Sequence, residues 1–264
     1  MSSPFPNLLA LWLFLLCGAT VSAAPLRICA DPNNLPFSNR SGSGFDNRIA
    51  LLIAHDLHRQ PLFVWTRPRR GFLREQFNRD VCDLLPGVPE RMHGLGVSAP
   101  YYASSYVFVT PSSDHLKIAS FSDPQLNGRR IGLQVLDEDL SPPSLPLIRA
   151  GHASQLVGFQ SFNSQEGKVV DAVANGTVSV AVVWGPAAGY YANRSTTALT
   201  LTPIPPSYTF SGIPFTYGIG FGVHHRDTSL LEEVNRSIAH LRPEIDQILM
   251  NYHVRIVSTN AEGR

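Results

Sequence analysis

The stretch Leu26 to Asn39, LRICADPNNLPFSN, decides how the chain begins to fold. Its first five residues place apolar side chains at alternate positions and predict a buried strand, which breaks at once into residues that favour turns. Ligands of open α/β proteins lie beyond the carboxyl ends of the strands, so a polar loop here predicts a recognition site. We expect Asp31, Asn33 and Asn34 either to line a cleft or to cap the loop through local bonds to the backbone. Phe37 is expected to stack on a ligand or partner, or to pack under the loop.

An export signal precedes this stretch. Residues 8–17 form an apolar run that is too short to span a bilayer comfortably, and the sequence VSA that ends at Ala23 has the small residues of a cleavage site. We therefore predict cleavage after Ala23. Cys17 offers a lipid anchor as the alternative, although Leu16 precedes it where a small residue is required. No later apolar run approaches the ~20 residues of a spanning helix, so no integral membrane segment is expected after cleavage.

The composition bounds the class of protein. Removing 23 residues from a chain of 264 leaves enough sequence for two lobes of roughly 100 to 150 residues each. A net charge of +1 and a charged fraction of 16% give no electrostatic argument for binding nucleic acid or an anionic membrane. The mature chain keeps two cysteines, Cys29 and Cys82, which in an oxidising compartment predict one disulfide. Two buried reduced thiols are the alternative.

Alternating strand and helix patterns occur twice along the chain. The first series predicts a parallel, doubly wound sheet, with strands at 26–30, 61–66, 81–88 and 106–110 and helices at 45–57 and 71–79. The second series starts afresh near residue 116 and therefore predicts a second lobe rather than an extension of the first sheet. Its strands are expected at 130–135, 155–159 and 177–184, and its helices at 166–174 and 185–193; a further strand is expected at 217–223, after several prolines. A final long helix at 229–252 should kink or split at Pro243.

Several strings occur together in the order of one known family. They are CADPNNLPFSN, GFDNRIALLIAHDL, RRGFLR, VCDLLPGVP, PYYASSYVFVT and VVDAVANGTVSVAVVWGPAAGYYA. With them the chain resembles the methanol dehydrogenase-associated binding-protein-like family (MoxJ/XoxJ type), a branch of the type II periplasmic solute-binding superfamily. The resemblance implies a periplasmic protein of two lobes, each a doubly wound, mostly parallel sheet with flanking helices. It also implies lobe boundaries at 24–111 plus 213–257 for the first lobe and 112–212 for the second, after a signal peptide at 1–23 and before a disordered tail at 258–264.

The chain departs from the amino-acid-binding relatives of that superfamily. Arg91 aligns with their carboxylate-binding Arg, but Pro86 stands where a Thr is expected, and Gln134 begins a different loop in place of their anion-binding one. Trp184 occupies the turn in which they carry an Asp for the ligand's amino group. A zwitterion needs charge-assisted bonds at both ends, so a free amino acid is not the expected ligand.

Candidate cleft residues each have a plainer interpretation. Arg91 is a possible cleft anchor, and Trp184 forms either the wall of an apolar cavity or ordinary core. Arg69 and Arg70 face an acidic partner or simply begin a solvated helix. Three consecutive acids at 137–139 are expected to be solvated rather than to bind a cation, and no metal or cofactor site is predicted. The cleft prediction therefore comprises Asp31, Asn33, Asn34, Phe37, Arg70, Arg91, Gln134 and Trp184.

These observations predict a non-catalytic accessory protein of a PQQ-dependent methanol or alcohol dehydrogenase, which aids maturation or activation of that enzyme. A solute-binding receptor of an ABC transporter is the first alternative. A dehydratase-like enzyme on the same fold is the second, with Glu90, Glu138 and Glu166 as the only acids near the expected cleft.

Overall fold

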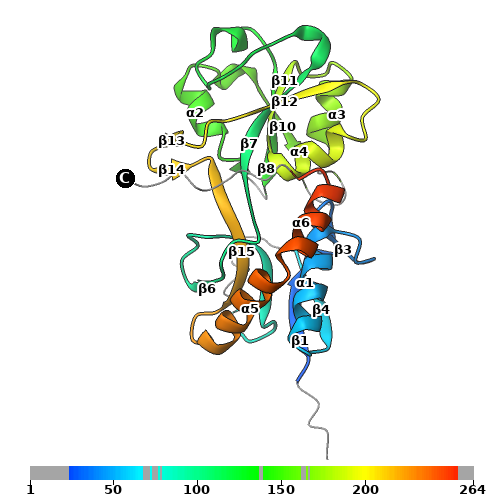
Figure 1. Cartoon of the computed structure of the whole chain (residues 1–264). Helices are drawn as coiled ribbons and strands as arrows, with labels where there is room; N and C mark the ends of the chain where they lie inside the picture. Colours follow the sequence, from blue (N-terminus) through cyan, green and yellow to red (C-terminus); the bar gives the residue numbers. More distant parts are fainter. Residues whose placement is uncertain are drawn as a thin grey trace, which may run out of the picture.

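A computed structural model describes residues 24–67, 72, 77, 79–136, 139–161, 165 and 167–254. The expected signal peptide and C-terminal tail lie outside these residues, as do Arg69 and Arg70. Figure 1 shows two lobes, with strands β7 (Tyr102–Pro111) and β15 (Thr216–His224) running from one to the other and helices packed on each sheet. This architecture confirms the predicted two-lobed α/β class.

The first lobe is built on a central strand from the opening stretch. Strand β1 (Leu26–Ala30) pairs in parallel with β4 (Pro61–Trp65) on one side and with β5 (Leu84–Pro89) on the other. The antiparallel strand β15 (Thr216–His224) continues this sheet and also pairs with β6 (Leu95–Val97). Helices α1 (Phe45–Asp56), α5 (Thr228–His240) and α6 (Arg242–Asn251) supply side chains to one large core cluster with this sheet.

The second lobe repeats the parallel pattern. Strand β8 (Ile131–Leu136) lies between β10 (Leu156–Gln160) and β11 (Val180–Trp184), and all three are parallel. Helices α3 (Lys168–Ala174) and α4 (Gly185–Ala192) pack into one core cluster, and α2 (Ser144–Arg149) packs into another. The smaller strands are β9 (Asp139–Leu140) and β12 (Leu199–Pro203) in this sheet, and two separate hairpins, β2 (Asn33–Asn34) with β3 (Ser38–Asn39) and β13 (Thr209–Phe210) with β14 (Ile213–Pro214).

Strand β7 (Tyr102–Pro111) belongs to both lobes. Residues 102–105 pair with β15, whereas residues 106–111 pair with β11 and β12. The main strand order is β10-β8-β11-β7-β15-β5-β1-β4, so hydrogen bonding runs without interruption from one lobe to the other. The second set of strands is thus a separate lobe, as expected, but its sheet is continuous with the first through β7 and β15.

Most elements lie where the sequence pattern predicts them. The helix expected at 45–57 is α1, and the final long helix is split just before Pro243, because α5 ends at His240 and α6 begins at Arg242. The short helix expected at 71–79 falls largely outside the described residues. Strands β6, β9 and β12, the two hairpins and α2 were not predicted.

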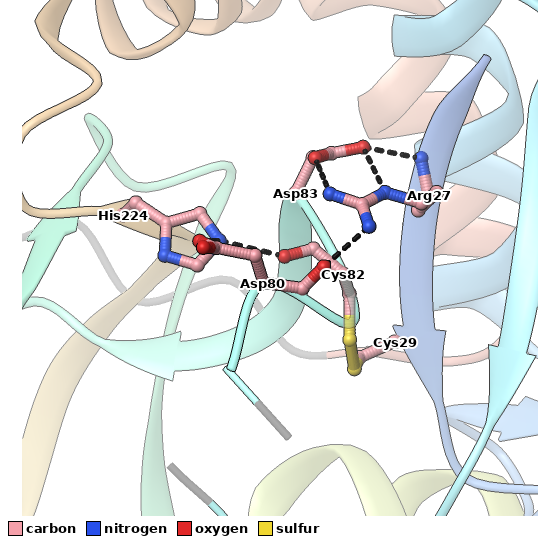
Figure 2. Close-up of a disulfide and its surroundings, with 6 residues drawn as sticks. All are labelled: Arg27, Cys29, Asp80, Cys82, Asp83 and His224. Carbon is pink, nitrogen blue, oxygen red and sulfur yellow. Dashed lines mark hydrogen bonds and ion pairs between the residues drawn. A yellow bond between two sulfur atoms is a disulfide. The ribbon is translucent and has the colours of Figure 1, made fainter. Parts of the chain in front are cut away.

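The predicted disulfide is confirmed. Cys29 on β1 and Cys82, just before β5, are both fully buried and bonded to each other across a Cα–Cα distance of 5.6 Å. Figure 2 shows polar contacts to one side of the bridge. The Arg27 guanidinium donates to both carboxylate oxygens of Asp83 at 2.6 and 3.1 Å, and His224 Nε2 lies 2.8 Å from the carbonyl oxygen of Cys82. The bridge therefore ties β1 to the start of β5 within an apolar cluster that includes Phe77 and Val88, beside this polar network.

Within the described residues, no helix combines the length and the apolar character needed to cross a membrane.

Candidate functional site

The loop after β1 is held by its own side chains. Asp31 Oδ1 accepts a hydrogen bond of 2.8 Å from the backbone N–H of Asn33, and the Ser38 hydroxyl donates to the Asp31 carbonyl at 2.6 Å. Burial raises the pKa of Asp31, while the Asn33 N–H and the charge of Arg67 oppose that rise. This is the local capping that the sequence offered as one of two interpretations, and Asn33 and Asn34 form strand β2 of the same loop.

Phe37 lies where the two lobes meet. Its ring packs on Phe45 of α1 with centroids 5.3 Å apart. Phe37 also packs against the core clusters of both lobes, and its side chain is only partly buried. The loop thus extends to the second lobe.

Four aromatic side chains form the junction cluster: Tyr102 and Tyr106 from β7, Trp184 from β11 and Tyr217 from β15. Trp184 is stacked on Tyr217, with centroids 4.6 Å apart and an interplanar angle of 17°, and its ring lies 5.2 Å from that of Tyr106. The Trp184 indole N–H donates to the Tyr102 hydroxyl, and the hydroxyls of Tyr106 and Tyr217 are bonded to each other. Burial raises the pKa of Tyr217 to about 12, so its phenol stays neutral at physiological pH. The cluster is apolar, uncharged and satisfied within itself.

Trp184 connects the interiors of the two lobes, because it packs against the main core of the first lobe and a core cluster of the second. The sequence had offered cavity wall and core packing as alternatives for this residue. Trp184 is partly buried and packs on both cores, whereas its role as a cavity wall stays a prediction.

A buried carboxyl group lies near the first loop. Asp46, in the first turn of α1, accepts a hydrogen bond of 2.6 Å from the Tyr101 hydroxyl, which itself accepts one of 3.0 Å from the N–H of Gly87. Burial raises the pKa of Asp46 to about 7, against the opposing effect of the Tyr101 bond. Among the acids of the described ranges, Asp46 alone is buried. The sequence analysis did not single it out, because nothing in the local pattern reveals its distant partner.

The remaining cleft candidates are scattered. Gln134 is buried on β8, with 8% of its surface exposed, and its backbone carbonyl accepts a hydrogen bond from the N–H of Ser141. Arg91 lies in an exposed turn after β5, and Arg70 is outside the described residues. The structure brings Phe37 and Trp184 against the same core, whereas their placement relative to a bound ligand stays a prediction.

Helix α4 of the second lobe is docked on the first lobe. The Tyr191 hydroxyl donates to the carbonyl of Leu35 at 2.8 Å, and Tyr190 is stacked on Tyr252 at 5.9 Å. A Cβ added to Gly189 would lie 2.3 Å from the carbonyl oxygen of His253, so only glycine permits this approach. Figure 1 shows the end of α6 beneath α4. These contacts fasten the two lobes to each other on the side of the first loop.

The described residues contain no group of three His, Cys, Asp or Glu side chains that could hold a metal ion. Of the three acids considered for catalysis, Glu90 lies in an exposed turn and the other two are outside the described ranges. Near the lobe junction, the arrangement offers apolar contact and neutral hydrogen bonds.

The sequence of this chain is similar to those of known proteins. No family model matches the chain. The protein MoxJ of Methylorubrum extorquens is 29% identical over 256 residues, which cover 90% of this chain and 84% of the relative. MoxJ of Paracoccus denitrificans is 26% identical, covering 90% and 91%.

Solved structures agree with the sequence relatives. The periplasmic binding protein XoxJ from Methylobacterium extorquens is 27% identical with a TM-score of 0.70, covering 88% of this chain and 99% of that one. MxaJ from Methlophaga aminisulfidivorans is 25% identical with a TM-score of 0.76, covering 88% of this chain and 100% of that one. An ancestral amino-acid-binding protein, a precursor of cyclohexadienyl dehydratase, is 20% identical with a TM-score of 0.62 and shares the fold alone. The chain is thus similar to the MoxJ, MxaJ and XoxJ proteins over about nine-tenths of its length and has the fold of a periplasmic binding protein.

Proposed function

We propose that this chain is a non-catalytic periplasmic accessory protein of methanol oxidation, which associates with a PQQ-dependent methanol or alcohol dehydrogenase and aids its maturation or activation. The similarity to MoxJ, MxaJ and XoxJ over about nine-tenths of the chain supports the broad role. The structure supports the finer role through the chemistry of the lobe junction.

The observation that carries the proposal is the neutral junction cluster. A receptor for an amino acid must offer charge-assisted bonds to both ends of a zwitterion. Here Trp184 and Tyr217 present stacked rings, and their polar atoms are used within the cluster. The buried carboxyl of Asp46 is engaged by Tyr101 rather than left open for an ammonium group. Such a surface suits apolar side chains of a polypeptide better than a charged metabolite.

The docking of α4 supports the same view. A transport receptor binds by closing its lobes around a solute and opening them again. In this chain the bond from Tyr191 to Leu35 and the close approach at Gly189 hold the second lobe against the first. A fixed pair of lobes favours surface contact with a protein over capture of a small solute.

Deleting the gene tests this function. The expected result is lower dehydrogenase activity per amount of dehydrogenase polypeptide in periplasmic extract, restored by the wild-type chain supplied in trans. Affinity-tagged protein should retain dehydrogenase prepared without PQQ more strongly than the mature enzyme. Full activity in the deletion strain, together with no retained dehydrogenase, would refute the proposal.

The transport alternative makes a different prediction. A receptor should release or absorb heat on titration with its solute, and its radius of gyration in solution should fall as the lobes close. We expect neither change with the common amino acids. Closure on one of them, with a normal deletion strain, would replace the accessory role by transport.

A further inference from the structure

Strand β4 is an unusual edge of the first-lobe sheet. Its five residues, Pro61 to Trp65, are all apolar, yet none of them is buried. Leu62 leaves 51% of its surface exposed. The strand stands at the end of the main sheet and, within the described part of the chain, pairs only with β1.

The backbone of β4 has one unpaired side. The N–H of Leu26 donates to the carbonyl of Gln60, and the N–H of Thr66 donates to the carbonyl of Ala30. In a parallel pair, alternate residues bond to the neighbour, so the even-numbered residues face β1. The N–H and C=O groups of Phe63 and Trp65 therefore point away from the sheet.

This edge lacks most of the usual protection. Natural edge strands carry charged residues, bulges or prolines that prevent pairing with another chain. Here Pro61 alone blunts the edge, at a residue whose N–H would face outward. The rings of Phe63 and Trp65 are stacked on the same face of the strand, with their centroids 5.0 Å apart. The result is an apolar strand whose outward backbone donors and acceptors have no backbone partner among the described residues.

The surroundings of the edge are basic. The Arg40 guanidinium lies over the Trp65 ring, 5.9 Å from its centroid, and Arg67 follows the strand as an exposed residue. Arg59 precedes the strand and donates to the backbone carbonyls of Ala24 and Pro25 at 3.1 Å, and the charge of Arg67 also acts on the carboxyl of Asp31. A segment lying along this edge would meet positive charge at both ends of the strand.

We propose that the β4 edge docks an extended, acidic segment of a partner polypeptide as an added strand. Outward backbone groups of Phe63 and Trp65 would bond to the segment, and its apolar side chains would pack against Leu62. Carboxylates of the segment would face the arginines, which favours acidic partners over basic ones. The site is separate from the lobe junction and does not depend on which protein is the partner.

The test uses the mature chain and two synthetic peptides. Trp184→Phe leaves Trp65 as the only tryptophan after residue 23, so its fluorescence reports directly on the edge. The probes are a capped heptapeptide of sequence Thr-Val-Glu-Val-Thr-Val-Glu and its counterpart with lysine in place of glutamate. We expect the acidic peptide to bind at least about tenfold more tightly than the lysine peptide. Its affinity should fall as added salt screens the charges.

Matched variants locate the binding. Phe63→Pro removes one outward N–H without breaking a bond to β1. Leu62→Glu places a carboxylate on the edge. Each variant should lower the affinity for the acidic peptide by about tenfold or more. Ile148→Glu makes the same change at a residue of similar exposure, 47%, in the second lobe and should leave affinity unchanged. Equal affinity for the two peptides, no binding of either, or binding that ignores Leu62→Glu would overturn the proposal. A concentration-dependent dimer that Leu62→Glu abolishes would instead assign the edge to a second copy of the chain and overturn it as well.

Discussion

Replacing Asp46 by Asn should change how stability depends on pH. The Asp46 carboxyl is buried in the first turn of α1 and accepts one side-chain hydrogen bond, from Tyr101 at 2.6 Å. Burial raises its pKa from 3.8 to about 7. An Asn side chain has nearly the same shape, and its amide oxygen can accept the same bond while carrying no charge at any pH.

The sign follows from proton binding. Between about pH 4 and 7 the folded state keeps the Asp46 proton while the unfolded chain releases it, so the free energy of unfolding falls as pH rises through this window. The contribution is complete below the unfolded pKa and is lost above the folded one. The interval between 3.8 and about 7 corresponds to about 4 kcal/mol at most. Asp46→Asn should therefore match the wild type near pH 4 and exceed its stability by up to that amount near pH 8.

Urea unfolding at a series of pH values, followed by tryptophan fluorescence, measures this difference. Asp171→Asn, at an exposed residue of α3, is the matched control and should follow the wild-type profile. Parallel profiles for Asp46→Asn and the wild type would show that the carboxyl is not held neutral in the folded state. A variant that loses stability relative to the wild type as pH rises would reverse the sign and refute the reasoning outright.

Three further changes test the framework around the site. Cys29→Ser opens a loop of 53 residues and should lower the free energy of unfolding by about 4 kcal/mol in urea titrations, whereas a loss below about 1 kcal/mol would contradict the chain-entropy argument. Burial alone would raise the pKa of the Asp83 carboxyl, but the hydrogen bonds from Arg27 and the positive charge of Arg27 lower it overall. The pair therefore stabilises the fold above the pKa that Asp has in the unfolded chain. This stabilisation is lost as pH falls through the lowered pKa of the folded state. Asp83→Asn should therefore cost about 2 kcal/mol at pH 7 and nothing in strong acid; a cost that persists in acid would assign the effect to packing. Gly189→Ala drives a methyl group into the carbonyl of His253 and should increase the radius of gyration measured by X-ray scattering with the far-ultraviolet circular dichroism unchanged; an unaltered radius would show that this contact does not hold the lobes.

Local sequence patterns were sufficient to predict most of the parallel strands and helices. Strand β1 and helix α1 lie close to their predicted ends, because alternating apolar residues and a helical stripe each report burial against a single neighbour. Strand β7 shows the limit of such patterns. It was expected to begin at Tyr106 but begins at Tyr102, since Ser104 and Ser105 give no strand signal and are extended only because they pair with β15, more than 100 residues later. Strand β12, which pairs with β7, was missed although its LTLTP sequence alternates apolar and polar residues, a pattern that favours a strand.

The site was predicted in part. Trp184 and Phe37 pack on the cores of both lobes, which a local sequence pattern does not reveal, and their role in binding stays a prediction. The bond between Asp46 and Tyr101 spans 55 residues, and an acid in the first turn of a helix is common for reasons of the helix dipole alone. The cleft roles of Arg91 and Gln134 stay predictions.

The path of β7 has a thermodynamic consequence. One strand contributes backbone bonds to the ladders of both lobes, and the backbone bond from Tyr106 to Phe215 lies at the point where the chain passes between them. Unfolding of either lobe would leave the β7 backbone of the other lobe without hydrogen-bond partners, so we expect neither lobe to stay folded alone. Despite its bilobed outline, the molecule should denature in a single calorimetric peak whose van't Hoff and calorimetric enthalpies agree.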